Sequence, residues 1–235
     1  PGYDSAPYIP AGNFATRDPD TGVQNLGTYR GGLKAADRIG VRMSTRSGGA
    51  GGYPHWLKYQ ARGEKMPCAI VLGCPHVVAY TGPQKLPMGI DELAVAGGLA
   101  GEPIRVTRCH SIDLLVPAEA EIIIEGLIDT EYLEPEAPFG ESHGHIALED
   151  FNMIFDVTAI TRKKDALFAS IITQVTPSES SAIKRDAYEQ MFLSHLRNSL
   201  GIRGVQNVVM HEPLSNIRRV IFLVMAPGTP KTEVW

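Results

Sequence analysis

Three carboxylates lie close together in the segment EPEAPFGE, residues 134–141, and they are the side chains best placed to do chemistry. Because proline fixes the backbone and glycine lets it bend, this segment is predicted to be a turn-rich loop that presents Glu136 and Glu141 to one cavity. A carboxylic acid held beside apolar surface or beside a second carboxylate has a raised pKa, which suits general acid–base catalysis. The spacing fits an exposed acidic loop equally well, which is the more common role of such a cluster.

A second set of polar residues lies in the segment TGVQNLGTYRGG, residues 21–32. Asn25 offers a neutral oxygen, and Arg30 is a permanent cation whose fork could hold a substrate carboxylate, a phosphate or a catalytic Glu. Glu92 follows at the start of a predicted helix, residues 88–99, and with Asn25 it could offer the hard oxygen ligands that Mg²⁺ or Mn²⁺ prefers. The plainer alternatives are a surface ion pair for Arg30 and a favourable first-turn charge for Glu92.

Two further patterns are weaker. The glycine-rich SGGAGG, residues 47–52, and the neighbouring GCP, residues 73–75, could donate backbone N–H groups to a phosphate, although neither matches a nucleotide-binding motif and a flexible turn is the simpler interpretation. His143 and His145 have the spacing that places two rings on one face of a strand, which is half of a zinc site. No third ligand stands at a recognisable spacing, so ordinary surface or core histidines fit better.

Composition excludes several classes of protein. The 235 residues include 22 Lys+Arg and 26 Asp+Glu, a net charge of −4, which argues against nucleic-acid binding. No apolar run approaches the ~20 residues that span a bilayer, so no membrane span is predicted. Three cysteines without a CxxC pattern argue against a disulfide framework and favour the cytoplasm. The first ten residues resemble neither a signal peptide nor an initiator segment, so we expect a piece of a longer chain.

Short apolar runs dominate the chain between residues 38 and 175 and favour an α+β or mostly β fold. Their connections are too short for repeated parallel crossovers, so antiparallel pairing in a barrel or closed sheet is predicted. The first 37 residues are rich in turn formers and are expected to wander over a surface, with extended stretches only around residues 9–14. A helix is predicted over Tyr53–Arg62, closed by Gly63. Strands are predicted at residues 38–43, 68–73, 104–108, 112–116, 121–128, 152–162 and 166–175.

The pattern changes near Thr176, where proline and serine signals precede a helical run that ends at Gly201. Two strand-like runs follow, residues 205–210 and 220–226. We therefore predict a domain over residues 1–177, followed over 178–235 by a linker helix and the beginning of another α/β domain.

The order of these motifs resembles one known family. TRDPDTGVQNLGTYR, SGGAGGYPHW, LGCP, PMGIDELAVAGGLAGEPIRV, VPAEAEIIIEG, EPEAPFGESHGH and VTAITRKKDALF follow one another as in the UbiD-type decarboxylases, whose cofactor is prenylated FMN. The resemblance implies a central split β-barrel of the flavin-reductase type, flanked in the family by N-terminal and C-terminal α/β domains. This chain looks like the central barrel with the start of the C-terminal region.

The resemblance also implies roles for individual residues. The family's catalytic Arg–Glu–Glu network falls on Arg30, Glu136 and Glu141, with Glu141 as the proton donor. A divalent metal, Mn²⁺ or Mg²⁺, would fall on Asn25 and Glu92, with potassium as a possible additional ion. Contacts to the flavin would fall on Thr28, Tyr29, Arg30, Arg42, Met43, Ser44, Ser47, Gly48, Cys74 and Pro75.

Two positions depart from the family pattern. Arg46 stands about where many relatives carry a histidine that can ligate the metal, and Ala137 stands where glycine is common. An arginine cannot ligate a metal, so Arg46 either meets the cofactor phosphate directly or alters metal binding.

The implied activity is reversible, non-oxidative decarboxylation of an aromatic or α,β-unsaturated carboxylic acid. Its partners would be that acid, CO₂ and further copies of the chain in a dimer or hexamer. One alternative is a split-barrel oxidoreductase that binds plain FMN, which would not need the carboxylates of residues 134–141. Another is a non-catalytic core piece or one subunit of a larger decarboxylase.

Overall fold

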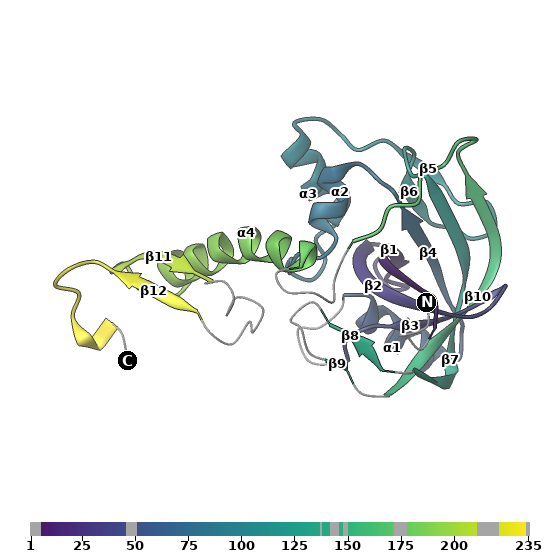
Figure 1. Cartoon of the computed structure of the whole chain (residues 1–235), viewed down its shortest axis with the longest axis horizontal. Coiled ribbons are helices and arrows are strands. Elements are labelled where there is room, and N and C mark those ends of the chain that lie inside the picture. Colours follow the sequence, from purple (N-terminus) through teal and green to yellow (C-terminus); the bar gives the residue numbers. More distant parts are fainter. Residues whose placement is uncertain are drawn as a thin grey trace. The chain divides into compact units, whose positions relative to one another are not determined.

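A computed structural model provides the structure of the chain (Figure 1). It divides into two compact units, and each is described by itself. The first unit comprises residues 1–139 and 148–170, and the second comprises residues 140–147 and 171–235. The structure describes residues 6–45, 51–136, 138–141, 146–147, 150–171, 178–210 and 221–233.

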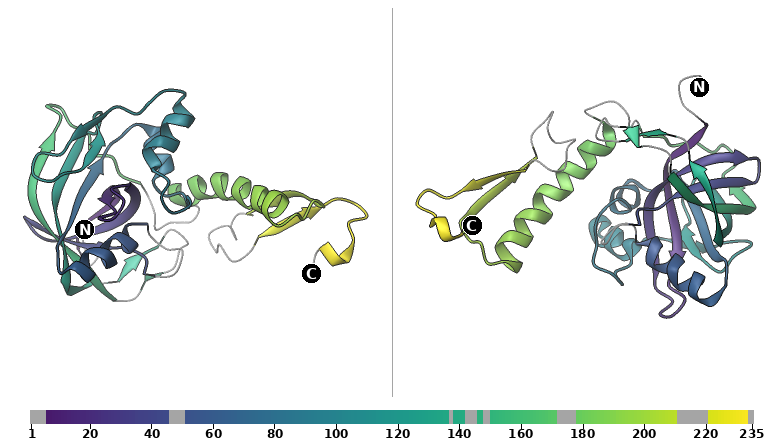
Figure 2. Two further views of the ribbon diagram at one scale, coloured as in Figure 1. Left: turned by 180° about the vertical axis from the view of Figure 1, so that it is seen from behind. Right: turned by 90° about the horizontal axis from the view of Figure 1, so that it is seen from below.

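The first unit is built on a closed antiparallel barrel with the strand order β1-β2-β3-β10-β7-β4. Figure 2 shows the barrel from two further sides. The prediction of a strand-rich fold with a barrel or closed sheet is therefore confirmed. The barrel strands are β1 (Tyr8–Arg17), β2 (Gln24–Ala35), β3 (Arg38–Arg42), β4 (Met66–Leu72), β7 (Ile122–Glu136) and β10 (Asp150–Arg162).

The extended stretch predicted around residues 9–14 lies within β1, but the prediction that the other opening residues wander over a surface is wrong, because β1 and β2 are long barrel strands. Glycines that look like turn signals occupy positions of close packing instead. A Cβ on Gly12 would lie 2.8 Å from the Ile70 side chain, and one on Gly31 would lie 2.9 Å from Ile39. Glycine in these strands therefore lets the barrel close tightly, and it marks no turn.

Apolar side chains fill the barrel and also cover part of its outside. The interior cluster includes Phe14, Ile70 and Phe155, all fully buried. A second cluster lies on the outer face, where Ala69 and Val71 of β4 pack with residues of two short helices. These helices, α2 (His76–Thr81) and α3 (Glu92–Ala100), contact each other outside the barrel (Figure 1).

The ends of the helices follow from local sequence signals. The predicted first helix is confirmed as α1 (Gly52–Arg62), and Gly63 ends it with a positive φ of 66°. The helix predicted over residues 88–99 begins only at Glu92. Asp91 caps it by accepting a hydrogen bond from the backbone N–H of Leu93, and Gly89 has a φ of 84° that helices do not allow.

Three other predictions concern strands. Short strands β5 (Val106–Arg108) and β6 (Leu115–Pro117) pair with each other close to their predicted places. By contrast, β7 continues to Glu136, so the first carboxylates of residues 134–141 lie on a strand and not in a loop. The strand predicted over residues 166–175 is absent from 166–171, the part that the structure describes.

The second unit contains a helix and a strand pair. Helix α4 (Glu179–Ser194) begins at a capping box made by Ser178 and Ser181, and it continues into the π-helical turn η1 (His195–Ser199). Strands β11 (Val205–Val209) and β12 (Phe222–Met225) pair antiparallel, close to their predicted places. The remaining short elements are β8 (Phe139–Gly140), at which the units divide, β9 (Ile146–Ala147) and η3 (Lys231–Glu233).

A turn after β1 gives a prediction for stability. Asp18 accepts hydrogen bonds from the backbone N–H groups of Asp20 and Thr21 and from Lys58 Nζ, at 2.9, 3.4 and 2.7 Å. Burial alone would raise the pKa of Asp18, but these bonds outweigh it and lower the pKa to about 2. Because the folded state holds the ionised form, this carboxylate stabilises the protein above its unfolded pKa and loses that effect as the pH falls towards 2.

Asp18→Asn is therefore expected to lower the free energy of unfolding at pH 7 by about 2 kcal/mol. The difference from wild type should shrink as the pH falls from 4 towards 2. Urea unfolding across that range measures it, with the exposed Asp165→Asn as the matched control. A difference that does not depend on pH would show that the Asp18 charge is not the cause.

Candidate functional site

A buried ion pair joins two of the predicted catalytic residues. Arg30 lies on β2, and Glu136 lies at the end of β7, 106 residues further along the chain. Arg30 Nε donates to Glu136 Oε1 at 2.9 Å, and Nη2 donates to Oε2 at 2.6 Å. Their side chains are 11% and 4% exposed. Two parallel hydrogen bonds in a buried position fix the plane of the guanidinium group.

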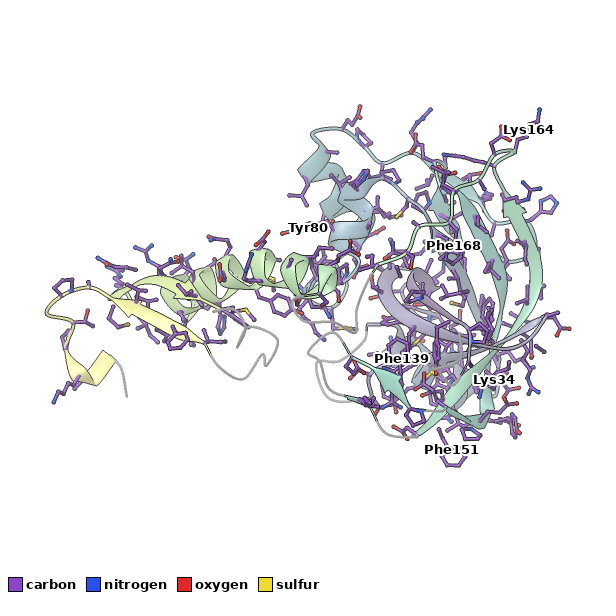
Figure 3. All side chains as sticks on the ribbon, in the orientation of Figure 1. Lys34, Tyr80, Phe139, Phe151, Lys164 and Phe168 are labelled. Atoms are coloured by element: carbon purple, nitrogen blue, oxygen red, sulfur yellow. The ribbon has the colours of Figure 1, made fainter. Side chains whose placement is uncertain are left out.

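An aromatic ring lies against Arg30, and a second ring packs on the first. Its Cζ lies 4.4 Å from the centre of the Phe139 ring, and the ring of Tyr8 lies 4.6 Å from that of Phe139. Figure 3 labels Phe139 beside the barrel. A cation over a ring face is attracted by the ring's quadrupole. The guanidinium is therefore held by a carboxylate and an aromatic face, and the sequence analysis did not foresee the aromatic part.

Arg42 extends this polar region across the sheet. It is the register partner of Arg30 between β2 and β3. Arg42 Nη1 lies 2.6 Å from Asp150 Oδ2 and donates to Asn152 Oδ1 at 3.1 Å. A backbone hydrogen bond from Phe151 and the contact with Arg42 lower the pKa of Asp150. Asp150 and Asn152 were missed by sequence reasoning, because only the register of β10 brings them here.

The two predicted metal ligands lie close together in the chain's fold. Glu92 Oε2 accepts a hydrogen bond from the backbone N–H of Leu26 at 2.7 Å, so its carboxylate lies at the peptide that follows Asn25. Burial raises the pKa of Glu92. Asn25 Nδ2 donates to the hydroxyl of Tyr29 at 3.3 Å. Burial also raises the pKa of Tyr29, to about 12, so its hydroxyl stays protonated at neutral pH.

These residues fit a divalent ion. Glu92 is 6% exposed, and no cationic side chain in the described part of the chain is seen to pair with it. The Asn25 oxygen faces Gly51, where a Cβ would lie only 1.9 Å from it. Across the described ranges no group of three or more His, Cys, Asp or Glu could hold a metal. An ion held by Asn25 and Glu92 would therefore keep water or phosphate ligands, as Mg²⁺ commonly does.

Glu92→Gln is expected to weaken Mn²⁺ binding by about tenfold or more, because the amide has no charge to offer the ion. Since only the ionised carboxylate ligates, and the pKa of Glu92 is raised, Mn²⁺ affinity should begin to fall at a higher pH than for an ordinary carboxylate. Mn²⁺ titration followed by electron paramagnetic resonance measures both effects, with the exposed Glu102→Gln as control. Equal affinity in Glu92→Gln and wild type would remove Glu92 from the metal site.

Two predicted flavin contacts are joined through a buried amide. Thr28 Oγ1 donates to Asn13 Oδ1 at 2.8 Å, and Asn13 Nδ2 donates to Cys74 Sγ at 3.2 Å. Asn13 is 3% exposed, and Gly82 packs against it so closely that a Cβ would lie 2.5 Å from its oxygen. Burial raises the pKa of Cys74, so the group is a thiol and not a nucleophilic thiolate. Pro75 is the residue that precedes α2.

The remaining predicted site residues take no part in the hydrogen bonds described above. Met43 is 1% exposed and its side chain packs in the barrel core. Ser44 follows it beyond the end of β3. Glu141 belongs to the second unit, and its role stays a prediction. The described residues do not include Arg46, Ser47, Gly48, Ala137, His143 or His145.

No helix in the described part of the chain is long and apolar enough to cross a membrane.

Several solved structures are similar to this chain in fold. The chain aligns over 98% of its length with an evolved dimeric form of the UbiD-class enzyme HmfF from Pelotomaculum thermopropionicum in complex with prFMN, at a TM-score of 0.88 and 27% identity. The same enzyme in complex with FMN gives the same score and identity. The closed form of vanillic acid decarboxylase from Sedimentibacter hydroxybenzoicus shares the fold, at a TM-score of 0.85 and 21% identity over 98% of this chain.

The chain spans about half the length of these proteins: 52% and 50% of the two HmfF chains and 48% of the vanillic acid decarboxylase. A family model described as "3-octaprenyl-4-hydroxybenzoate carboxy-lyase Rift-related domain" matches residues 2–176. That match takes in the whole barrel, with the Arg30–Glu136 pair and the residues around Glu92. The chain therefore belongs to the UbiD family of carboxy-lyases.

Proposed function

We propose that the protein containing this chain catalyses reversible, non-oxidative decarboxylation of an aromatic or α,β-unsaturated carboxylic acid with prenylated FMN. The buried, two-bond pair of Arg30 and Glu136 carries the proposal, because an oriented cation beside a carboxylate suits a reaction whose substrate is an acid. Membership of the UbiD family and the likeness to HmfF in complex with prFMN support the choice of cofactor. When bound, prenylated FMN supplies an electron sink for the carbon that loses CO₂.

The chain's own residues would bind and orient the substrate and would protonate the carbon that loses CO₂. Arg30 would orient the substrate carboxylate, while Glu136 and Phe139 hold its guanidinium in place. The bond between the substrate carbon and its carboxylate carbon breaks, CO₂ leaves, and a proton takes its place on that carbon. We assign delivery of this proton to Glu141 as the general acid. In the carboxylation direction the same carboxylate would take the proton back.

The other proposed contacts concern the cofactor and its ion. Asn25 and Glu92 would hold a Mn²⁺ or Mg²⁺ ion, with potassium as a second ion that the family resemblance suggests. The flavin contacts would include Thr28, Tyr29 and Cys74, two of which Asn13 already joins by hydrogen bonds. The full set that we propose also contains Arg30, Arg42, Met43, Ser44, Ser47, Gly48 and Pro75.

We further propose a homo-oligomeric, cytoplasmic enzyme in which residues 1–177 form the cofactor domain and residues 178–235 lead into a second domain. One HmfF relative is described as an evolved dimeric form, which supports assembly but sets no number of copies for this chain. Native mass spectrometry of the full-length protein measures that number.

The function is tested by CO₂ release from a panel of aromatic and acrylic acids. The full-length protein is supplied with prenylated FMN in one series and with plain FMN in the other. Release only in the first series is the expected result. Oxidation of NADH or NADPH with plain FMN, without CO₂ release in either series, would instead identify a split-barrel oxidoreductase and overturn the proposal.

A further inference from the structure

A small cavity of about 80 Å³ lies beside Arg42, at the neighbouring ends of β3 and β10. Since one water molecule takes up roughly 30 Å³ of liquid, this space suits two or three waters or one small oxyanion group. Tyr53 and Trp56 form an aromatic wall, with their rings stacked at 5.8 Å. The cavity's other residues include Leu133, Phe151 and Asn152. Figure 3 shows Phe151 at the edge of the barrel.

Asn152, one of the residues that line this cavity, has a hydrogen-bond donor without a partner in the described part of the chain. The residue is 4% exposed, and its Oδ1 accepts a hydrogen bond from Arg42. Its Nδ2 is buried and has no hydrogen-bond partner within the described part of the chain. A buried donor without a partner is destabilising, and folded proteins rarely keep one without a reason. A bound ligand with an atom that accepts hydrogen bonds would satisfy this donor.

The charges around the cavity favour an acceptor that is negative. Arg42 supplies the cation. Its ion-pair partner Asp150 has 52% of its side chain accessible, so solvent screens the negative charge of that carboxylate. The indole N–H of Trp56 is already donated to the backbone oxygen of Asp129 at 2.9 Å, so it does not compete for the ligand. No acidic side chain is among the residues that line the cavity.

We propose that Asn152 Nδ2 and the Arg42 guanidinium bind an oxyanion, a phosphate or a carboxylate group, in this cavity. Arg42 is the register partner of Arg30, so the cavity lies near the residue that we propose to orient the substrate. The assignment of the oxyanion to the flavin or to the substrate therefore rests on the proposed function. Asn152 would then be a binding residue that positions the ligand relative to the Arg30–Glu136 pair.

Asn152→Asp keeps an oxygen that can accept from Arg42, replaces the donor with a second oxygen and adds a negative charge, so it is read together with a neutral variant. Inorganic phosphate and benzoate are titrated into the full-length protein without flavin, and their dissociation constants are measured by ³¹P and ¹H NMR. FMN and riboflavin, which differ by the phosphate, are titrated by fluorescence. Asn152→Leu is that neutral variant, because it removes the donor without adding a charge, and binding must weaken in it as well. Asn198→Asp, a residue exposed on η1, is the isosteric control.

Asn152→Asp is expected to weaken binding of phosphate or benzoate by about tenfold or more, while Asn198→Asp stays within about twofold of wild type. A phosphate site would also weaken FMN but spare riboflavin, whereas a carboxylate site would weaken benzoate but spare FMN. Binding of all four probes unchanged in Asn152→Asp, or no binding of phosphate or benzoate to wild type, would overturn the proposal. If Asn152→Asp loses phosphate binding but the wild type releases no CO₂ from any acid of the panel, the proposed function is refuted and the oxyanion site stands.

Discussion

Glu141→Gln in the full-length protein is expected to lower the rate of CO₂ release by about 10²- to 10⁴-fold while leaving flavin affinity unchanged. The amide has nearly the shape of the carboxyl group, but its N–H protons are too weakly acidic to be transferred to the carbon that loses CO₂. Turnover is measured with prenylated FMN supplied, and flavin affinity is measured by fluorescence titration.

The matched control for this variant is Glu131→Gln, an exposed glutamate on β7. It makes the same chemical change outside the proposed site and should keep both turnover and flavin affinity. Turnover retained in Glu141→Gln would remove this residue as the acid. Loss of flavin together with turnover would point to a structural role instead.

Glu136→Ala is expected to lower the free energy of unfolding by about 3–5 kcal/mol, because it removes the carboxylate that makes two hydrogen bonds to the buried Arg30 cation. The variant Arg30→Met with Glu136→Leu removes both charges and fills similar space, so it should be close to wild type in stability. Urea unfolding at pH 7 of Arg30→Met alone, Glu136→Leu alone and the double variant completes the cycle. Single effects that simply add would show that the two side chains do not stabilise each other.

The same double variant separates stability from function. If Arg30 orients the substrate carboxylate, a stably folded Arg30→Met, Glu136→Leu protein should release no measurable CO₂. Full activity in that protein would mean that the pair serves only the fold.

The parts of the fold that local signals control were predictable from the sequence. The apolar run in β4, the alternation in β3 and the glycine after Arg62 each depend on residues near in the chain. The full length of β1 and the whole of β2 were missed because Gly12 and Gly31, which look like turn signals, pack against Ile70 and Ile39 on neighbouring strands. Local patterns cannot distinguish such a glycine from one in a turn.

The candidate site was also predictable only in part, because its residues come together from different strands. Spacing gave no reason to pair Arg30 with Glu136, since they lie 106 residues apart; the resemblance to a family supplied that pairing, and the geometry agrees with it. Nothing in the sequence marked Asn13, Phe139 or Asn152. Each acquires its place only when the strands are in register, as when Met153 of β10 pairs with Val41 of β3 and sets Asn152 beside Arg42.

Decarboxylation in D₂O tests the central claim most directly. The full-length protein with prenylated FMN converts an acid identified in the panel, and the product is examined by mass spectrometry and NMR. One deuterium on the carbon that lost CO₂, with product formation strongly reduced in Glu141→Gln, is the expected result. Equal product formation with plain FMN, or unchanged deuterium incorporation at a wild-type rate in Glu141→Gln, would contradict the account.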